Sequence, residues 1–394
     1  MKTIAIVGGG PAGAMTGEKL ARGFAANHNG QGPTRVVVFE EKFGWEKPCG
    51  GGLSHKALRR YPFLLESEGF GKPVQNMEVW APGGAVLRLR LREPLAIYTR
   101  RELNHFLLQR SEKAGTEVIK DRIVGFTRVG ERWELKGREE RYQADHLVLA
   151  TGARSRLRKH LVDDLKPRDF MLTFGYYVPG NEDLLRIEFF EDFEGYAWSF
   201  PRLGHLSVGI CGKVGQTTMA ELQQNLGAFM NRCGYSSTSA PVFSHLLPSL
   251  VADSWGDLRL AGPGWALVGD VGGLADPVTG EGIYFALRSG ELLAEALLSG
   301  FPDRYPQQVW DEFGSMLMLG ARMCPSFYRG DFLGDAVTTR TIQFAARSKT
   351  FRSLFQSLVE GTQTYHGLPA RFLCSLPKSL IEATARTLLE RVGF

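Results

Sequence analysis

Two glycine-rich stretches dominate this sequence: Gly269-Asp270-Val271-Gly272-Gly273-Leu274-Ala275-Asp276-Pro277-Val278-Thr279-Gly280-Glu281-Gly282 and, about 260 residues earlier, Gly8-Gly9-Gly10-Pro11-Ala12-Gly13. The earlier stretch follows an apolar run from Ile4 to Val7 and precedes a segment with helical spacing from Ala14 to Ala26. A second apolar run, Arg35 to Glu40, comes next. Strand, glycine turn, helix and strand in this order predict a β-α-β unit that binds a dinucleotide.

The spacing of Gly8, Gly10 and Gly13 matches the G-x-G-x-x-G pattern of dinucleotide-binding turns. The first glycine allows a tight turn, the second lets the backbone approach a pyrophosphate, and the third permits close helix packing. Glu40 is expected to accept hydrogen bonds from a ribose. The gap from Gly13 to Glu40 exceeds the ~20 residues usual for this motif, and a polar loop at 27–33 accounts for the excess. From this half alone, FAD and NAD are equally favoured.

The later glycine stretch favours FAD, because a nicotinamide dehydrogenase has no need of it. Asp270 is placed to bond the hydroxyls of a ribityl chain. Gly280 and Gly282 come directly before an apolar helix at 282–298. The positive end of that helix would face the pyrimidine edge of the flavin and favour its reduced, anionic state.

Size and composition restrict the class of protein. The chain has 394 residues, 43% of them hydrophobic, which is enough for two cores. Its formal charge of +5 comes from scattered basic residues, so nucleic-acid binding is not expected. Five cysteines without a C-x-x-C pair and eight histidines without metal spacing predict reduced thiols and no metal site. No apolar run reaches the ~20 residues of a membrane span, so any membrane contact is expected to be peripheral. The reduced thiols, together with a first apolar run too short for a signal peptide, favour a cytoplasmic protein.

The rest of the sequence alternates between two kinds of pattern. Residues 74–92 alternate apolar and basic side chains and predict one half-buried antiparallel strand, whereas 101–114 predict a helix. Residues 146–150 read as a return to the parallel sheet. From about 170 to 211, aromatic and β-branched residues with period two predict a separate antiparallel sheet.

These patterns predict an α/β fold, α+β overall. A Rossmann-type FAD-binding domain would be discontinuous, made from 1–60, 95–165 and 257–300. A second, antiparallel-sheet domain for the substrate would take 61–94 and 166–256, and 301–394 would form a helical carboxy-terminal region.

Besides the two glycine stretches, three further segments are recognisable motifs: Lys47-Pro48-Cys49-Gly50-Gly51-Gly52, Thr99-Arg100-Arg101-Glu102-Leu103-Asn104 and Gly195-Tyr196-Ala197-Trp198-Ser199-Phe200-Pro201. With these segments the chain resembles, over nearly its whole length, the FAD-dependent geranylgeranyl reductase family. That family lies within the larger class of aromatic-hydroxylase and halogenase flavoproteins. The reductase expectation depends mainly on the cysteine-glycine loop and on the Tyr-x-Trp-x-Phe-Pro segment.

The resemblance implies roles for single residues. It implies that Cys49, Gly50 and Gly52 lie close to the flavin, that Arg100 contacts the cofactor, and that Val124 meets the adenine through its backbone. Together with the glycine motifs, the predicted cofactor-binding residues are Gly8, Gly10, Ala12, Gly13, Ala14, Glu40, Cys49, Gly50, Gly52, Arg100, Val124, Gly152, Asp270, Gly280, Gly282 and Ile283.

An aromatic strand is the predicted substrate wall. Tyr196, Trp198 and Phe200 stand at every second position of one predicted strand and therefore share a face. A row of aromatic rings on one face suits a long apolar ligand. The alternative is that these rings are simply core. Cys49, Tyr196 and Trp198 are the predicted catalytic or substrate-pocket residues. Cys49 is not assigned as the proton donor, because an ordinary thiol is a weak acid.

The sequence departs from its relatives at two places. Phe193 stands where the family has the first proline of Pro-x-x-Tyr-x-Trp-x-Phe-Pro, and Thr151 stands where many hydroxylases have Asp before Gly152. A second G-x-G-x-x-G motif is absent from the sequence. We therefore expect electrons from NAD(P)H bound transiently, or from a ferredoxin-type protein.

The expected activity is reduction of carbon–carbon double bonds in an isoprenoid, geranylgeranyl-type or similar apolar substrate, by hydride transfer from N5 of reduced FAD. A flavin monooxygenase or halogenase is the alternative enzyme, because halogenases carry a similar Trp-x-Trp-x-Ile-Pro segment. A non-catalytic flavin-binding or lipid-carrier protein is the third reading. Lys378, Arg386 and Arg391 in an apolar terminal helix would allow peripheral contact with the inner membrane face, although a solvated helix face is favoured.

Overall fold

The computed structural model describes residues 1–26, 33–66, 71–368, 370–372, 374–375, 377–378 and 382. The chain divides into two compact units of three segments each: unit 1 is Met1–Lys47, Arg100–Phe170 and Leu246–Met318, and unit 2 is Pro48–Thr99, Met171–His245 and Leu319–Phe394. The polar loop expected at 27–33 lies outside the described residues except for Pro33. The same holds for Arg386 and Arg391 of the expected basic terminal helix.

Unit 1 is built on a six-stranded sheet whose strands are nearly all parallel. The order is β16 (Ala261–Gly262), β17 (Trp265–Leu267), β10 (His146–Leu149), β1 (Lys2–Val7), β2 (Thr34–Phe39) and β6 (Glu117–Ile119). Only the β16–β17 pair among them is antiparallel. The expected β-α-β unit is therefore present, with helix α1 (Pro11–Ala26) between β1 and β2.

Three helices pack around α1 or its neighbours in unit 1: α3 (Arg100–Lys113), α5 (Ile283–Leu298) and α6 (Tyr305–Val309). A short π-helical turn, Trp310–Gly314, links α6 to α7 (Ser315–Arg329). A separate three-stranded sheet contains β7 (Gly125–Val129), β8 (Arg132–Lys136) and β9 (Arg141–Ala144). The core of the unit includes residues from β1, β2, β10 and β17, which are apolar because both faces of the sheet are covered.

Helices α1 and α5 approach each other at backbone distance. A Cβ on Gly290 would lie 2.5 Å from the carbonyl oxygen of Ala12, so only glycine fits there. The Thr16 hydroxyl lies 2.8 Å from the Ala12 carbonyl oxygen and 3.3 Å from that of Gly290. Because each helix begins at one glycine stretch, this contact fixes the two stretches relative to one another.

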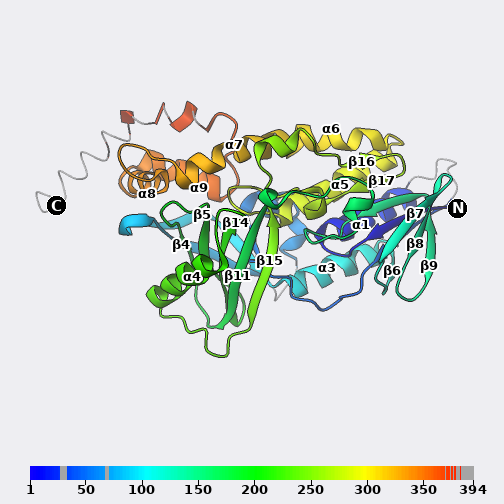
Figure 1. Cartoon of the computed structure of the whole chain (residues 1–394), viewed down its shortest axis with the longest axis horizontal. Coiled ribbons are helices and arrows are strands. Elements are labelled where there is room, and N and C mark those ends of the chain that lie inside the picture. The colour runs from blue at the N-terminus through cyan, green and yellow to red at the C-terminus, as the bar shows by residue number, and fades with distance from the viewer. Residues whose placement is uncertain are drawn as a thin grey trace, which may run out of the picture. The chain divides into compact units, whose positions relative to one another are not determined.

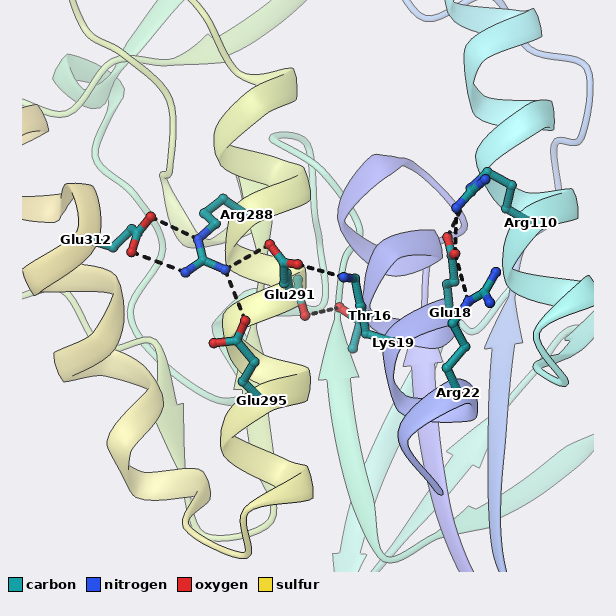
Figure 2. Close-up of polar contacts among 10 residues, drawn as sticks. Thr16, Glu18, Lys19, Arg22, Arg110, Arg288, Glu291, Glu295 and Glu312 are labelled. Carbon is teal, nitrogen blue, oxygen red and sulfur yellow. Dashed lines mark hydrogen bonds and ion pairs between the residues drawn. The ribbon is translucent and has the colours of Figure 1, made fainter. Parts of the chain in front are cut away.

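An ion-pair cluster continues the contact between these helices (Figure 2). The buried Arg288 of α5 pairs with Glu291 at 2.8 Å and with Glu312 at 3.0 Å, while Lys19 of α1 pairs with Glu291 at 2.7 Å. On the other face of α1, Glu18 accepts hydrogen bonds from Arg22 and Arg110. Glu291 therefore joins α5 to α1 through Lys19, while Arg288 pairs with it inside α5 and reaches Glu312.

We expect Arg288→Ala to destabilise the protein by about 2–3 kcal/mol, because it removes a buried cation that pairs with the buried Glu291. Arg22→Ala is the matched control, since Arg22 is mostly exposed and its loss should cost about 0.5 kcal/mol or less. Urea unfolding of both variants measures the difference. Equal unfolding midpoints for the two variants would contradict the role given to Arg288.

Unit 2 is built on an eight-stranded sheet whose strands are mainly antiparallel. Its order is β15 (Val242–Pro248), β11 (Phe170–Pro179), β14 (His205–Lys213), β13 (Gly195–Pro201), β12 (Leu184–Glu188), β4 (Gly71–Trp80), β5 (Val86–Tyr98) and β3 (Gly52–Leu53). The β12–β4 pair is parallel, whereas β11–β14, β14–β13, β13–β12, β4–β5 and β5–β3 are antiparallel. Helix α4 (Met219–Cys233), capped by Thr218, covers part of the sheet through Leu222, Leu226 and Phe229.

The prediction of one strand over 74–92 was wrong. The segment folds as a hairpin, in which β4 and β5 pair antiparallel around a turn at Pro82–Gly84. Gly83 has φ 74° and Gly84 has φ 87°, so both glycines take the left-handed conformation that a tight turn requires. The alternation along β5 is real, with Leu87, Leu89 and Leu91 buried.

The other helices of unit 2 lie in its first and last segments. Helix α2 (His55–Arg60) comes after the cysteine-glycine loop, and α8 (Val337–Arg347) and α9 (Lys349–Val359) lie side by side (Figure 1). The predicted fold class is confirmed: a Rossmann-like sheet, a mainly antiparallel sheet and carboxy-terminal helices. No helix in the described part of the chain combines the length and apolarity needed to cross a membrane.

Candidate functional site

The first glycine turn lies where β1 ends and α1 begins. Gly8 has φ +108°, and a Cβ there would lie 2.4 Å from the carbonyl oxygen of Ala150. A Cβ on Gly13 would lie 1.9 Å from the carbonyl oxygen of Gly8. In contrast, a Cβ on Gly10 would meet no described atom within 4 Å. Gly8 and Gly13 are thus required by the protein's own packing, whereas Gly10 keeps a space open.

Glu40 holds this turn from the end of β2. Its carboxylate accepts hydrogen bonds from the backbone N–H of Gly9 and of Lys42, both at 2.8 Å. The acidic residue at this position therefore has a structural task as well, because it ties β2 to the glycine turn. Its contact with a ribose stays a prediction.

The second glycine stretch meets the first one inside unit 1. A Cβ on Gly269, whose φ is +68°, would lie 3.0 Å from the Cβ of Ala12. The following residue, Asp270, is in a short 3₁₀ turn at Gly269–Gly272. Its carboxylate lies 2.6 Å from the ammonium of Lys47. Two segments distant in sequence are therefore brought to one place, as the two-stretch pattern predicts.

Helix α5 starts at this place. Gly282 is its N-cap residue, and within the described residues no side chain caps the helix. The first helical residue, Ile283, is buried. The turn before it is held by Asp276, whose carboxylate accepts hydrogen bonds from the backbone of Val278 and Thr279, and Gly280 has φ 72°. An uncapped helix start presents backbone N–H groups to an electron-rich partner.

Arg100, the residue expected to contact the cofactor, opens helix α3 and is buried. Its guanidinium donates to Asn104 at 3.2 Å, but its Nε has no hydrogen-bond partner in the described part of the chain. A buried guanidinium N–H without an acceptor is costly. The orphaned Nε is the kind of donor that a phosphate or carbonyl oxygen of a bound group satisfies.

Sequence reasoning missed Arg158, which supports the second glycine stretch. This buried arginine donates to the carbonyl oxygen of Val271, beside Asp270, and to that of Asp163 at 3.0 Å. Burial, the largest influence, lowers the pKa of Arg158, and nearby aspartates oppose that shift. The available signal was an arginine-rich turn after Gly152, which has φ +74° and open space at its Cβ position.

Two smaller expectations complete unit 1. Val124 is exposed, and its backbone N–H donates to the carbonyl oxygen of Lys136 at 2.8 Å. Thr151, the residue that replaces the hydroxylase Asp, shares a 2.6 Å hydrogen bond with the hydroxyl of Ser155. The adenine contact of Val124 stays a prediction. Ala14 is buried within α1, where it serves the packing of that helix.

In unit 2 the structure brings the two signature motifs together. A Cβ on Gly50 would lie 2.7 Å, and one on Gly52 2.9 Å, from the ring of Phe200 in the Tyr-x-Trp-x-Phe-Pro strand. A Cβ on Gly51, whose φ is +86°, would lie 2.0 Å from the carbonyl oxygen of Tyr98. The ring of Phe200 therefore occupies the space beside Gly50 and Gly52. Their closeness to a flavin stays a prediction.

Arg202 fixes the cysteine loop and was also missed from the sequence. It has no exposed surface, and it donates to the carbonyl oxygens of Cys49 at 2.6 Å and Gly50 at 3.4 Å. The Ser207 hydroxyl donates to the same Cys49 oxygen at 3.0 Å. The Cys49 thiol accepts from the backbone N–H of Gly51 at 3.3 Å. The backbone of the loop is therefore tied to β14 through Ser207 and, through Arg202, to the residue that follows β13.

The aromatic strand β13 is partly core and partly accessible. Trp198 is buried over Gly209, where a Cβ would lie 2.4 Å from its ring. It stacks on Phe243 and contacts Tyr196 edge-on at 6.1 Å. Tyr196 and Phe200 are half-buried. Trp198 is therefore part of the core, whereas Tyr196 and Phe200 keep some exposed surface, and a substrate contact of these rings stays a prediction.

Phe193, at the position of the missing proline, belongs to the core of unit 2. Its ring lies where a Cβ on Gly195 or Gly212 would fall, at 2.8 Å and 2.9 Å. It also contacts Phe190 edge-on at 5.6 Å. This substitution therefore changes packing behind the strand.

The residues of unit 1 fit FAD on three observations. Open space lies at Gly10, where a pyrophosphate must approach the backbone. Arg100 carries a buried, unsatisfied Nε. Ala12 and Gly269 bring both glycine stretches to one place.

The chain is similar in sequence to known oxidoreductases. A family model described as pyridine nucleotide-disulphide oxidoreductase matches residues 2–169. The geranylgeranyl diphosphate reductase of Synechocystis sp. is 27% identical over 403 residues, covering 90% of this chain and 93% of that protein. The chloroplastic geranylgeranyl diphosphate reductase of Arabidopsis thaliana is 26% identical over 328 residues, but the match covers 75% of this chain and only 66% of the plant protein.

Solved structures give the same fold. A geranylgeranyl bacteriochlorophyll reductase-like protein from Thermoplasma acidophilum aligns with TM-score 0.71 at 20% identity, covering 87% of this chain and 91% of that one. The flavin-dependent brominase Bmp2 aligns with TM-score 0.69 at 16% identity, covering 91% and 93%. The expected resemblance is confirmed: the chain is an FAD-dependent oxidoreductase distantly related, at 26–27% identity, to geranylgeranyl reductases, and it shares its fold with a flavin-dependent brominase.

Proposed function

We propose that this FAD-dependent oxidoreductase reduces carbon–carbon double bonds of an isoprenoid, polyprenyl or similar apolar chain. The observation that carries the proposal is the contact between the two signature motifs: Phe200 of the aromatic strand packs on Gly50 and Gly52. Both motifs are those of the reductase relatives, and their joining makes one surface out of a cysteine loop and an aromatic strand. Reduced FAD, when bound, supplies a hydride from N5.

The chain's own residues would bind and orient the substrate. Tyr196 and Phe200, both half-buried, offer ring surface to a long apolar chain. Trp198 is locked between Gly209 and Phe243, so it holds the strand's position. Arg202 and Ser207 hold the Cys49 backbone, which keeps the loop in one conformation. The alkene carbon that does not receive the hydride takes a proton from water or a nearby side chain.

The electron source is proposed as NAD(P)H bound transiently or a ferredoxin-type protein. Support comes from the sequence, which has one G-x-G-x-x-G turn and Thr151 in place of the hydroxylase acid. An apolar or lipid substrate would also explain any peripheral contact with the inner membrane face. Neither proposal requires a nucleic-acid partner.

A flavin monooxygenase or halogenase is the second candidate, and the specific observation in its favour is the likeness to brominase Bmp2. That likeness is at 16% identity and concerns the fold alone. The sequence leans the other way, because Tyr196 replaces the first Trp of the halogenase segment and Cys49 with its glycines has no counterpart there.

The test is single-turnover reduction. Purified protein loaded with FAD is reduced anaerobically and mixed with geranylgeranyl compounds, and flavin absorbance is followed. We expect flavin reoxidation together with products heavier by H₂ per reduced bond in mass spectrometry. Flavin that stays reduced with every polyprenyl compound would count against the proposal. Rapid oxygen consumption with a hydroxylated or halogenated product would favour the second candidate.

A further inference from the structure

The sequence motifs do not assign Lys47, yet this lysine lies at the second glycine stretch. Its ammonium is 2.6 Å from the carboxylate of Asp270, and the two side chains are only 17% and 10% exposed. The two residues are 223 positions apart in the sequence. A lysine ammonium is strongly hydrated, so holding it away from water requires a compensating charge.

Its neighbour Glu46 serves the same site. The Glu46 carboxylate accepts the backbone N–H of Arg100 at 2.9 Å and of Arg101 at 2.8 Å, at the first residues of α3. A carboxylate at the N-terminus of a helix accepts hydrogen bonds from backbone N–H groups that have no partner inside the helix, and its negative charge interacts favourably with the helix dipole. Glu46 thus holds the start of α3, and the next residue, Lys47, holds the carboxylate of Asp270.

The charge of Lys47 is expected to affect the reduction of a bound flavin more than the stability of the fold. An ion pair this far from solvent adds little to stability compared with apolar side chains of the same size. It does place a fixed positive charge beside the aspartate that the glycine pattern assigns to the ribityl chain. Charges near a flavin set how easily it is reduced, because the reduced form is anionic.

We propose that Lys47 is a positioning residue of the flavin site that orients Asp270 for the ribityl hydroxyls and compensates its negative charge. This inference rests on the proposed FAD site of unit 1, but not on the proposed substrate. Without the ammonium, the negative charge of Asp270 beside the flavin would lose the compensation that Lys47 gives it. Both FAD affinity and the ease of flavin reduction would then fall.

The experiment is a charge cycle with four FAD-loaded proteins: wild type, Lys47→Gln, Asp270→Asn and the double variant. FAD Kd is measured by fluorescence titration of apoprotein, and the midpoint potential by anaerobic dye equilibration. We expect Lys47→Gln to weaken FAD binding about tenfold, as loss of one charge-assisted contact does. Its potential should be more negative than that of wild type, and the potential of Asp270→Asn should be more positive. The double variant should return toward wild type.

Two controls make the outcome specific. Lys47→Arg keeps the charge and should preserve the potential, and Lys42→Gln removes an exposed lysine of the same segment and should behave as wild type. A Lys47→Gln protein with a lower melting temperature but an unchanged potential would overturn the inference, because the role would then be structural. Wild-type protein that binds no FAD would instead overturn the flavin site itself.

Discussion

Alanine at Gly10 should give a protein that folds normally and is purified without FAD. The fold should tolerate the change, because the new Cβ would meet no described atom within 4 Å. The same space is where a dinucleotide pyrophosphate approaches the backbone. A methyl group forced against that ligand costs about 3 kcal/mol, which weakens binding roughly 100-fold.

Gly13→Ala is the matched comparison, since its Cβ would lie 1.9 Å from the carbonyl oxygen of Gly8. That clash is inside the protein, so this variant should lose stability whether or not FAD is added. Melting curves with and without FAD, together with the ratio of flavin to protein absorbance, separate the two effects. A Gly10→Ala protein as yellow and as tightly bound to FAD as wild type would contradict this reading of the turn.

The glycine turns could be predicted from sequence because their information is local. Gly8, Gly10 and Gly13 have fixed spacing between a strand and a helix, and Glu40 follows at the end of the next strand. The second stretch adds Asp270 and two glycines at a helix start. Each of these features occupies consecutive residues, so the chain order alone places them. Together they were enough to predict the fold class.

Long-range partners could not be predicted in the same way. Lys47 pairs with Asp270 and Arg202 with the Cys49 carbonyl, and in both pairs the residues are far apart in sequence. A single charged residue carries no periodic signal that names its partner. The resemblance implies that Gly50 and Gly52 lie close to a flavin, but it does not predict that Phe200 fills the space next to them.

The missed hairpin is a different kind of error. The sequence Pro82-Gly83-Gly84 carries a turn signal, but the regular alternation of leucine and arginine after it suggested one long strand. Alternation reports which face of a strand is buried and does not report where the strand starts. Turn residues therefore deserved more weight than periodicity at this point.

Arg202→Met should destabilise unit 2 and expose Cys49. The buried guanidinium donates to the carbonyl oxygens of Cys49 and Gly50, and a methionine of similar length donates to neither. Leaving buried carbonyls with fewer donors costs about 3 kcal/mol. Ser207→Ala should cost only about 1 kcal/mol, because Arg202 still donates to the same Cys49 oxygen.

Thiol alkylation followed by peptide mass spectrometry reads out the loop directly. With looser anchoring, Cys49 should react about tenfold faster, corresponding to an opening easier by about 1.4 kcal/mol. The exposed Cys374 gives an internal reference, because its rate should be the same in every variant. Arg59→Met, an exposed arginine of the same unit, should leave both the melting temperature and the Cys49 rate unchanged. If Arg202→Met also left the Cys49 rate unchanged, Arg202 would be a packing residue that does not hold the loop, and the shared surface of cysteine loop and aromatic strand would need another anchor.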